Sequence, residues 1–176
     1  ELDLFLGEQP AESASPSGTE KKPRGPAVDH TADDARIRAI FVRTFAHDIV
    51  ERMAEHAAIP VINGLTDYSH PCQAMADYLT MLELKGDLRG LKVAFIGDGN
   101  NVCHSLMFAG AQLGAHTWVA TPEGYEPASE AVEWAVQRGW TTGSTCTLTN
   151  DPVEAARDAD VIYTDVWASM GQEAEA

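Results

Sequence analysis

The sequence predicts an α/β fold in which parallel sheets carry helices on both faces. Short segments rich in Val, Ile, Phe and Leu alternate with longer segments whose apolar residues recur at helical spacing. Glycine or proline stands at most boundaries between them. Strands that alternate with helices pair in parallel, because each helix returns the chain to the starting edge of the sheet. A parallel sheet of this kind is covered on both faces.

Four elements are predicted before residue 88. Residues 38–43 are apolar between two arginines, which predicts a buried strand. Residues 47–57 carry apolar side chains at helical spacing, and residues 60–63 form a short apolar strand that a glycine ends. The second helix covers residues 71–85, because proline is tolerated in its first turn and the glycine that follows stops it.

Residues 91–96 form the clearest predicted strand, and a Gly-Asp-Gly turn leads from it into a helix over residues 102–113. The remaining predicted elements are a strand over residues 117–120, a helix over residues 129–138 ended by Gly139, a strand over residues 145–148, a helix over residues 152–157 and a strand over residues 161–164. The pattern restarts near residues 88–91. We therefore expect two partial domains, residues 37–88 and residues 89–176.

Residues 1–36 differ from the rest of the chain in composition. Pro, Glu, Ser, Lys and Gly dominate from about residue 7 to residue 34, without an apolar period. Such a segment buries too little apolar surface to offset the entropy of ordering it. We expect residues 1–36 to be low-complexity and disordered.

Composition excludes several classes of protein. The net charge is −15 and only 12 residues are Lys or Arg, which argues against a nucleic-acid surface. No apolar stretch approaches the ~20 residues of a membrane span, and the N-terminus has no signal-peptide pattern. The three cysteines lack CxxC spacing, which argues against a disulfide scaffold or a structural zinc site. We expect a cytoplasmic protein that binds no nucleic acid, membrane or metal.

Polar residues follow the predicted strands of the first partial domain, where parallel sheets bind ligands. His70 and Gln73 stand at the start of the second helix, whose positive dipole end favours a carbonyl or phosphate oxygen. Alternatively, His70 caps the helix and Gln73 is its capping-box partner. Arg43 ends its strand, where it could polarise a carbonyl, hold a phosphate or form an exposed ion pair.

The second partial domain offers a similar edge. The run Gly97-Asp98-Gly99-Asn100-Asn101 lacks the third glycine of a dinucleotide site, and no acidic residue ends the next strand, so we expect no NAD. Its Asp and Asn residues could cap the helix while one Asn side chain also faces a substrate. Asp165 could meet a substrate ammonium or serve as a turn residue. The histidines without ligand spacing, which we expect on the surface or in the core, are His47, His56, His104 and His116.

Six segments share the pattern of one enzyme family, in the expected order. They are residues 41–45, 60–67, 70–77, 97–105, 120–127 and 165–171. The most specific runs are His70-Pro71-Cys72-Gln73, the Gly-Asp-Gly-Asn-Asn run and Asp165-Val166-Trp167-Ala168-Ser169-Met170-Gly171. These segments resemble the aspartate/ornithine carbamoyltransferase family, and the Ser-Met-Gly run is typical of its ornithine branch. The resemblance extends from about residue 37 to residue 175.

The resemblance implies parts of two Rossmann-like domains: a carbamoyl-phosphate-binding domain over residues 37–88 and an ornithine-binding domain over residues 89–176. In this family the carbamoyl group moves from carbamoyl phosphate to the side-chain amine of L-ornithine, giving citrulline and phosphate. No metal or organic cofactor takes part, and the family is trimeric. We therefore expect these two substrates, no cofactor and a homotrimer.

The resemblance also assigns site residues. Arg43 and His70 would be the catalytic donors to the carbonyl oxygen, where preorganised donors stabilise growing negative charge. Gln73 would join them in binding carbamoyl phosphate, by holding the carbamoyl amide. Asp165 would pair with the α-ammonium of ornithine. The residues that would bind ornithine are Asn101, Asp165, Ser169 and Met170.

Two parts of the family pattern have no counterpart in this sequence. The Ser-x-Arg-Thr-Arg run that cradles phosphate does not occur before residue 37, and the His-Cys-Leu-Pro loop would lie beyond Ala176. We therefore expect a partial chain with little or no turnover by itself. Two other interpretations stay open: a non-catalytic α/β remnant that binds an amino acid or a partner subunit, and a carbamoyltransferase for another amine.

Overall fold

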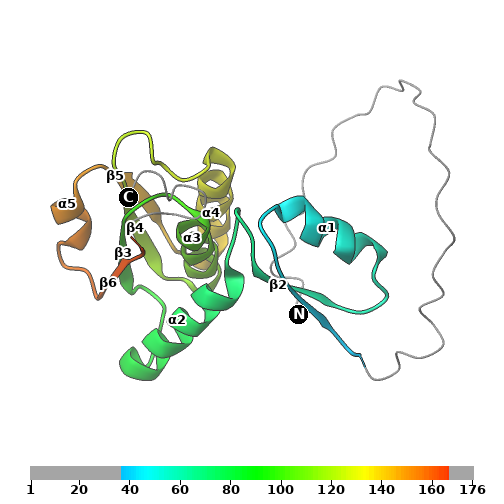
Figure 1. Ribbon diagram of the computed structural model, residues 1–176. Coiled ribbons are helices and arrows are strands. Elements are labelled where there is room, and N and C mark those ends of the chain that lie inside the picture. Colours follow the sequence, from blue (N-terminus) through cyan, green and yellow to red (C-terminus); the bar gives the residue numbers. More distant parts are fainter. Residues whose placement is uncertain (1–36, 167–176) are drawn as a thin grey trace, which may run out of the picture. The chain divides into compact units, whose positions relative to one another are not determined.

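The computed structural model describes residues 37–166 (Figure 1). The elements in chain order are β1 (Ile40–Arg43), α1 (His47–His56), β2 (Val61–Leu65), α2 (Pro71–Lys85), β3 (Lys92–Ile96), α3 (Asn101–Leu113), β4 (His116–Ala120), α4 (Ser129–Thr142), β5 (Cys146–Thr149), α5 (Pro152–Ala156) and β6 (Val161–Thr164). The disorder expected for residues 1–36 lies outside the described residues, as do the predicted site residues Ser169 and Met170.

Strands β3 to β6 form a parallel sheet in the order β5-β4-β3-β6. Phe95, in β3, lies opposite Val119 of β4 and Tyr163 of β6. On this face of the sheet the side chains pack with α3 and α4, whereas on the other face Ala94 packs with Ala155 of α5. Helices thus cover both faces (Figure 1). The predicted α/β fold with parallel sheets is confirmed.

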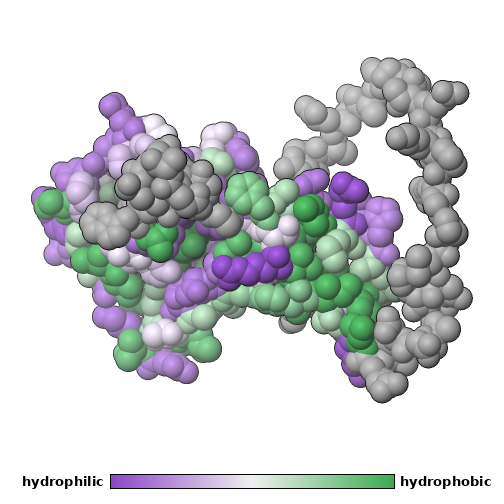
Figure 2. Space-filling model, viewed as in Figure 1, coloured by the Kyte–Doolittle hydropathy of each residue, from purple (hydrophilic) through white to green (hydrophobic). Residues whose placement is uncertain are grey.

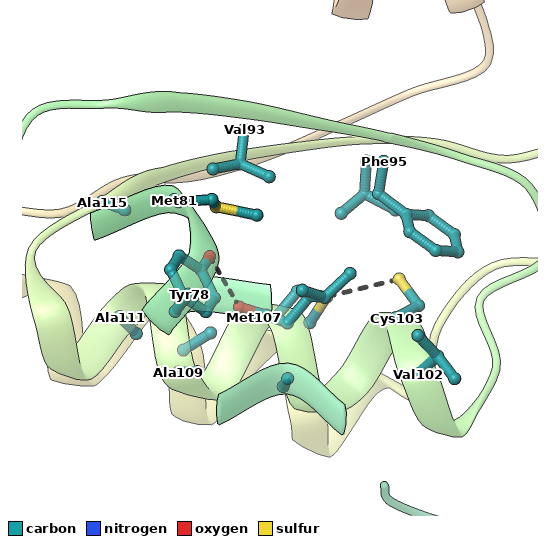
Figure 3. Close-up of a cluster of buried hydrophobic side chains, with 14 of the residues drawn as sticks. Tyr78, Met81, Val93, Phe95, Val102, Cys103, Met107, Ala109, Ala111 and Ala115 are labelled. Atoms are coloured by element: carbon teal, nitrogen blue, oxygen red, sulfur yellow. Dashed lines mark hydrogen bonds between the residues drawn. The ribbon is translucent and has the colours of Figure 1, made fainter. Parts of the chain in front are cut away.

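Helix α2 packs against α3 through Tyr78, which is fully buried (Figure 3). Its hydroxyl donates a hydrogen bond of 3.1 Å to the carbonyl oxygen of Leu106. Gly110 permits the close approach, because a Cβ there would lie 2.5 Å from the Tyr78 hydroxyl oxygen. Burial raises the pKa of Tyr78, so the hydroxyl stays protonated and able to donate. This contact fixes the middle of α2 relative to α3.

Strands β1 and β2 form a separate two-stranded parallel sheet with a register shift between Val42 and Arg43. Gly64 lies within β2, so the prediction that it ends this strand is wrong; a Cβ at Gly64 would collide with the ring of Phe41. The strand predicted over residues 38–43 is present as β1, but the prediction that it is buried is wrong. Phe41 is 63% exposed, and Figure 2 shows apolar surface around these strands. Side chains alternate between the two faces of a strand, and every second residue of β1 is exposed. Among the described residues, β1 pairs with only one strand, β2.

Glycines end the long helices. Gly86 and Gly114 adopt positive φ angles of 83° and 82° directly after α2 and α3, as the sequence predicts. The predicted stop at Gly139 is wrong, because α4 continues for another turn and Gly143 caps it. Gly139 is buried inside the helix, where a Cβ would lie 2.5 Å from the carbonyl oxygen of Ser144. No helix within residues 37–166 is long and apolar enough to span a membrane.

Candidate active site

The candidate site is assembled around the segment between β2 and α2. The N–H of Thr66 donates to the carbonyl oxygen of Ser69 at 2.8 Å, which closes a tight turn just before His70. Two residues of α3 hold this turn: the Asn101 side-chain amide donates to Thr66 O at 2.5 Å, and Ser105 Oγ accepts from the His70 N–H at 2.7 Å. The start of α3 therefore sets the position of His70.

His70 occupies the N-cap position of α2, but its side chain makes no capping hydrogen bond. Its Nδ1 atom is buried and has no hydrogen-bond partner among the described residues. Burial and the nearby charge of Arg43 lower the pKa of His70, while Asp165 and Asp77 act in the opposite direction. The imidazole is therefore neutral at pH 7. The alternative in which the His70 side chain serves as a helix cap is wrong.

Gln73 is exposed on the first turn of α2, and its Nε2 donates to Asp77 Oδ1 at 2.9 Å. A capping-box residue would reach back to the N-cap N–H instead. That group is engaged elsewhere, because the N–H of His70 donates to Ser105. The capping-box interpretation of Gln73 is thus wrong. The structure leaves Gln73 at the same helix end as His70, with its carbonyl oxygen turned away from Asp77.

Arg43 and Asp165 approach His70 from the ends of two different strands. Arg43 is exposed at the end of β1 and forms no ion pair with any described residue, so the predicted surface ion pair is not found there. Asp165 follows β6 and is half-buried. The charges of both residues act on His70 in opposite directions. Three of the predicted site residues therefore influence one another electrostatically.

The loop between β3 and α3 joins Asp165 to the helix. Asn100 is the N-cap of α3, and its Oδ1 accepts hydrogen bonds from the N–H groups of Val102 and Cys103 at 3.0 and 3.1 Å. The Nδ2 of Asn100 donates to Asp165 Oδ2 at 2.8 Å. Asn100 thus caps the helix, as predicted for this run, and also orients the carboxylate. The sequence-based prediction assigned Asn101, and not Asn100, to the site. Nothing in the sequence distinguishes the roles of these two consecutive asparagines.

Asn101 itself is 7% exposed, and its amide nitrogen donates to the carbonyl oxygen of Thr66. This contact crosses between the first turn of α3 and the end of β2. In the described structure the Asn101 amide therefore ties the two segments together. Its proposed part in substrate binding rests on the family resemblance.

A row of aromatic rings and histidines lies beside the turn before α2. Neighbouring ring centroids along His47, Tyr68 and His104 are 5.1 Å apart. His104 Nδ1 lies 2.8 Å from the carbonyl oxygen of Tyr68, and its Nε2 accepts from the N–H of Ala128 at 3.0 Å. Only a neutral ring with the proton on Nδ1 satisfies both contacts. His104 is therefore a core histidine, one of the two locations expected for it.

The segment before Ala128 also holds the loop after β3. The N–H of Gly97 donates to Ala120 O at 3.1 Å, and the N–H of Gly99 donates to Tyr125 O at 2.7 Å. Gly99 has no room for a side chain, because a Cβ would collide with the backbone of Pro127. His104 therefore reaches both the turn before His70 and the segment that positions the Asn100 loop. Isolated histidines and glycines in the sequence do not reveal this arrangement.

A cavity in the described structure lies away from the site, and the residues that the structure describes contain no metal cluster. A cavity of about 550 Å³ lies near the C-terminal ends of α2, α3 and α4, and no predicted site residue lines it. Within residues 37–166, no group of three His, Cys, Asp or Glu side chains could hold a metal ion. The described site consists of hydrogen-bond donors, one carboxylate and one neutral imidazole. Such groups can bind and polarise a small polar substrate.

Comparison with known proteins places this arrangement in a family. Residues 89–176 match the family model described as "Aspartate/ornithine carbamoyltransferase, Asp/Orn binding domain", and residues 12–83 match its "carbamoyl-P binding domain". An ornithine carbamoyltransferase of Pyrococcus horikoshii is 59% identical over 150 residues, which make up 82% of this chain and 47% of that protein. One of Bacillus subtilis is 56% identical over 154 residues, 86% and 48% of the two chains. The chain spans about half the length of the curated relatives it matches.

Solved structures give the same result. The ornithine carbamoyltransferase from Pyrococcus furiosus superposes with a TM-score of 0.76 at 59% identity, over 80% of this chain and 45% of that chain. The enzyme from Gloeobacter violaceus gives a TM-score of 0.73 at 48% identity, over 75% and 46% of the two chains. Sequence, fold and the order of the two matched domains all agree. The chain therefore belongs to the aspartate/ornithine carbamoyltransferase family.

Proposed function

We propose that this chain carries part of the active site of an ornithine carbamoyltransferase. The reaction would transfer the carbamoyl group of carbamoyl phosphate to the side-chain amine of L-ornithine, giving citrulline and phosphate. The observation that carries the proposal is that a neutral His70 at the start of α2 is influenced by the charges of both Arg43 and Asp165, which stand at the ends of two strands. The identity to proteins named ornithine carbamoyltransferases supports it.

The chemistry fits the groups around His70. A neutral amine attacks the carbonyl carbon, negative charge grows on the carbonyl oxygen, and the bond to phosphate then breaks as the new nitrogen loses a proton. Arg43 supplies a permanent positive charge for that oxygen or for the phosphate. A neutral His70 supplies one N–H donor without adding a further charge. Donors already held in place stabilise the transition state without reorganising.

Gln73 and the residues after β3 and β6 would complete the two substrate sites. Gln73 would hold the carbamoyl amide next to His70. Asp165, oriented by Asn100, would pair with the α-ammonium of ornithine. The further ornithine-binding residues in this proposal are Asn101, Ser169 and Met170. Holding both substrates in attack geometry contributes up to roughly 7–11 kcal/mol in well-oriented reactions.

Titration of carbamoyl phosphate into the purified chain tests the first half of the proposal. We expect saturable binding that His70→Ala weakens by about tenfold or more, because a hydrogen bond to a charged ligand is lost. The matched control is His56→Ala, since His56 is exposed on α1 and its Nδ1 lies 2.8 Å from the carbonyl oxygen of Arg52 in its own helix. Absence of saturable binding by the unaltered chain would refute a live site and favour a non-catalytic remnant.

Titration of amines in the presence of carbamoyl phosphate tests the second half. L-ornithine should bind, and Asp165→Asn should weaken it, whereas Asp48→Asn on the exposed face of α1 should not. Putrescine, which keeps both amines of ornithine but lacks the α-carboxylate, should bind more weakly than ornithine. Equal or tighter binding of putrescine would point to a carbamoyltransferase for another amine.

We also propose that the protein acts in the cytoplasm as a homotrimer, the state that the family resemblance implies. Sedimentation equilibrium of the purified chain tests the assembly state. A trimeric mass that is stable on dilution supports this proposal, and a monomeric mass at all concentrations contradicts it.

A further inference from the structure

We propose that Asp77 is a positioning residue that fixes the side-chain amide of Gln73, so that the Gln73 carbonyl oxygen faces the ligand and selects a carbamoyl NH₂ group. This inference rests on the proposed function, because it concerns the group that Gln73 would bind. Asp77 lies four positions after Gln73 on α2 and would not itself touch the substrate.

The contact between the two side chains determines the orientation of the amide. Gln73 Nε2 lies 2.9 Å from Asp77 Oδ1. A carboxylate only accepts hydrogen bonds, so the NH₂ side of the amide must face Asp77. The Oε1 atom then points the other way and can only accept. Without Asp77, both orientations of the amide would be available, since its two ends differ little in size and shape.

Asp77 is less accessible to solvent than an ordinary carboxylate on a helix surface. It is half-buried, and its Oδ2 atom is fully shielded from solvent. Burial and the Asp77 carboxylate together raise the pKa of Tyr163 on β6, which places the tyrosine hydroxyl beside Asp77 as a neutral group. Asp77 therefore lies between the α2 surface and the end of β6.

The chemistry of the donor explains why the orientation matters. The carbamoyl group of carbamoyl phosphate carries an NH₂ that needs an acceptor, and an amide oxygen supplies one. Acetyl phosphate has the same shape, but a methyl group replaces the NH₂. A fixed Oε1 favours the carbamoyl compound and leaves the methyl compound without a partner. An amide free to rotate would lose much of this preference.

The test compares the two acyl phosphates in binding titrations. In Asp77→Ala, the ratio of the acetyl phosphate Kd to the carbamoyl phosphate Kd should fall by about tenfold, the value of one hydrogen bond, through weaker carbamoyl phosphate binding. Asp77→Glu keeps a carboxylate acceptor and should restore much of the ratio. Glu83→Ala, an exposed carboxylate on the same helix, is the matched control and should leave the ratio unchanged.

A double-mutant cycle separates positioning from general damage to the helix. In a Gln73→Ala background, Asp77→Ala should cause no further change in the ratio, because the amide that it orients is gone. Equal weakening of both acyl phosphates by Asp77→Ala would overturn the proposal, since a merely structural role affects both ligands alike.

A measurement without ligand distinguishes failure of this inference from failure of the proposed function. The side-chain NH₂ signals of Gln73 in a ¹⁵N-labelled chain should shift on Asp77→Ala and stay in place on Glu83→Ala. Unchanged Gln73 signals in Asp77→Ala would overturn the positioning role. If the unaltered chain binds neither phosphate, the proposed function fails, and these signals alone decide whether Asp77 orients Gln73.

Discussion

Asn100 Nδ2 donates a hydrogen bond of 2.8 Å to Asp165 Oδ2, across 65 positions of sequence. The same Asn100 side chain accepts two N–H groups of α3 through its oxygen. One amide therefore caps a helix with its oxygen, which accepts, and orients a carboxylate with its nitrogen, which donates. The position of Asp165 depends on a residue that belongs to another strand end.

This relationship predicts that the two functions of Asn100 can be separated. Asn100→Ser keeps a good N-cap oxygen but is too short to reach Asp165, whereas Asn100→Ala loses both contacts. The free energy of unfolding should fall by about 1 kcal/mol in Asn100→Ala and by less in Asn100→Ser. Ornithine binding should weaken similarly in both variants. Urea denaturation and titration measure the two effects. Normal ornithine binding by Asn100→Ser would show that Asp165 does not need this partner.

Gly99 leads to a prediction about the loop that carries Asn100. A Cβ at Gly99 would collide with the backbone at Pro127, which cannot move as a flexible side chain would. We expect Gly99→Ala to lower the free energy of unfolding by about 1–3 kcal/mol, as overpacking does. Gly124→Ala is the comparison: it meets nothing within 4 Å but has a φ of 86°, so only backbone strain of about 1–2 kcal/mol applies.

Structural disturbance distinguishes these two glycine variants better than stability does. Backbone NMR shifts of residues 97–101 should move in Gly99→Ala and stay in place in Gly124→Ala. Equal shifts in both variants would contradict the close packing of Gly99 on the segment before α4.

The contact between Tyr78 and Gly110 predicts strong coupling between α2 and α3. Tyr78→Phe leaves the carbonyl oxygen of Leu106 without its partner from the tyrosine and should cost about 1–2 kcal/mol of unfolding free energy. Gly110→Ala should cost more, because its Cβ would lie 2.5 Å from the Tyr78 hydroxyl oxygen. In the double variant that oxygen is gone, so the combined cost should be smaller than the sum. Additive costs in urea denaturation would contradict this contact.

The sequence predicts the fold well where local signals agree with packing. The bounds of β6 and the glycines that end α2 and α3 are predicted correctly, because apolar runs and terminal glycines act locally. Gly139 misled the prediction of α4, since its absent side chain serves a close approach by Ser144 rather than a helix end. Residues 38–43 look like a buried strand, yet burial depends on neighbouring strands that a local apolar pattern cannot specify.

The candidate site was predictable only in part, for a physical reason. His70 and Gln73 stand at a helix start, and Arg43 and Asp165 follow strands, so sequence places all four at a ligand-binding edge. The residues that hold the site together could not be predicted in this way. The hydrogen bonds between Asn100 and Asp165 and between His104 and the backbone of Ala128 join segments distant in sequence. Such pairings depend on tertiary contacts, and residue type alone does not encode them.

The hydrogen bonds of His104 predict how stability depends on pH. Its Nε2 accepts from the Ala128 N–H, so a proton on Nε2 would break that bond. Burial lowers the pKa of His104, although a backbone hydrogen bond to Tyr68 and the charge of Glu130 on α4 oppose the shift. Below about pH 6.5 the unfolded chain therefore binds more protons than the folded chain, and stability falls as the pH drops. The loss levels off below the folded pKa.

Urea denaturation between pH 5 and pH 8 checks this expectation. The free energy of unfolding should decrease from pH 7 to pH 5.5, and His104→Gln should flatten part of that slope while lowering stability at pH 7. His70 also has a lowered pKa and contributes a slope of the same sign, so His70→Ala should remove a separate part. A steep slope that survives loss of both His104 and His70 would show that other groups control acid stability.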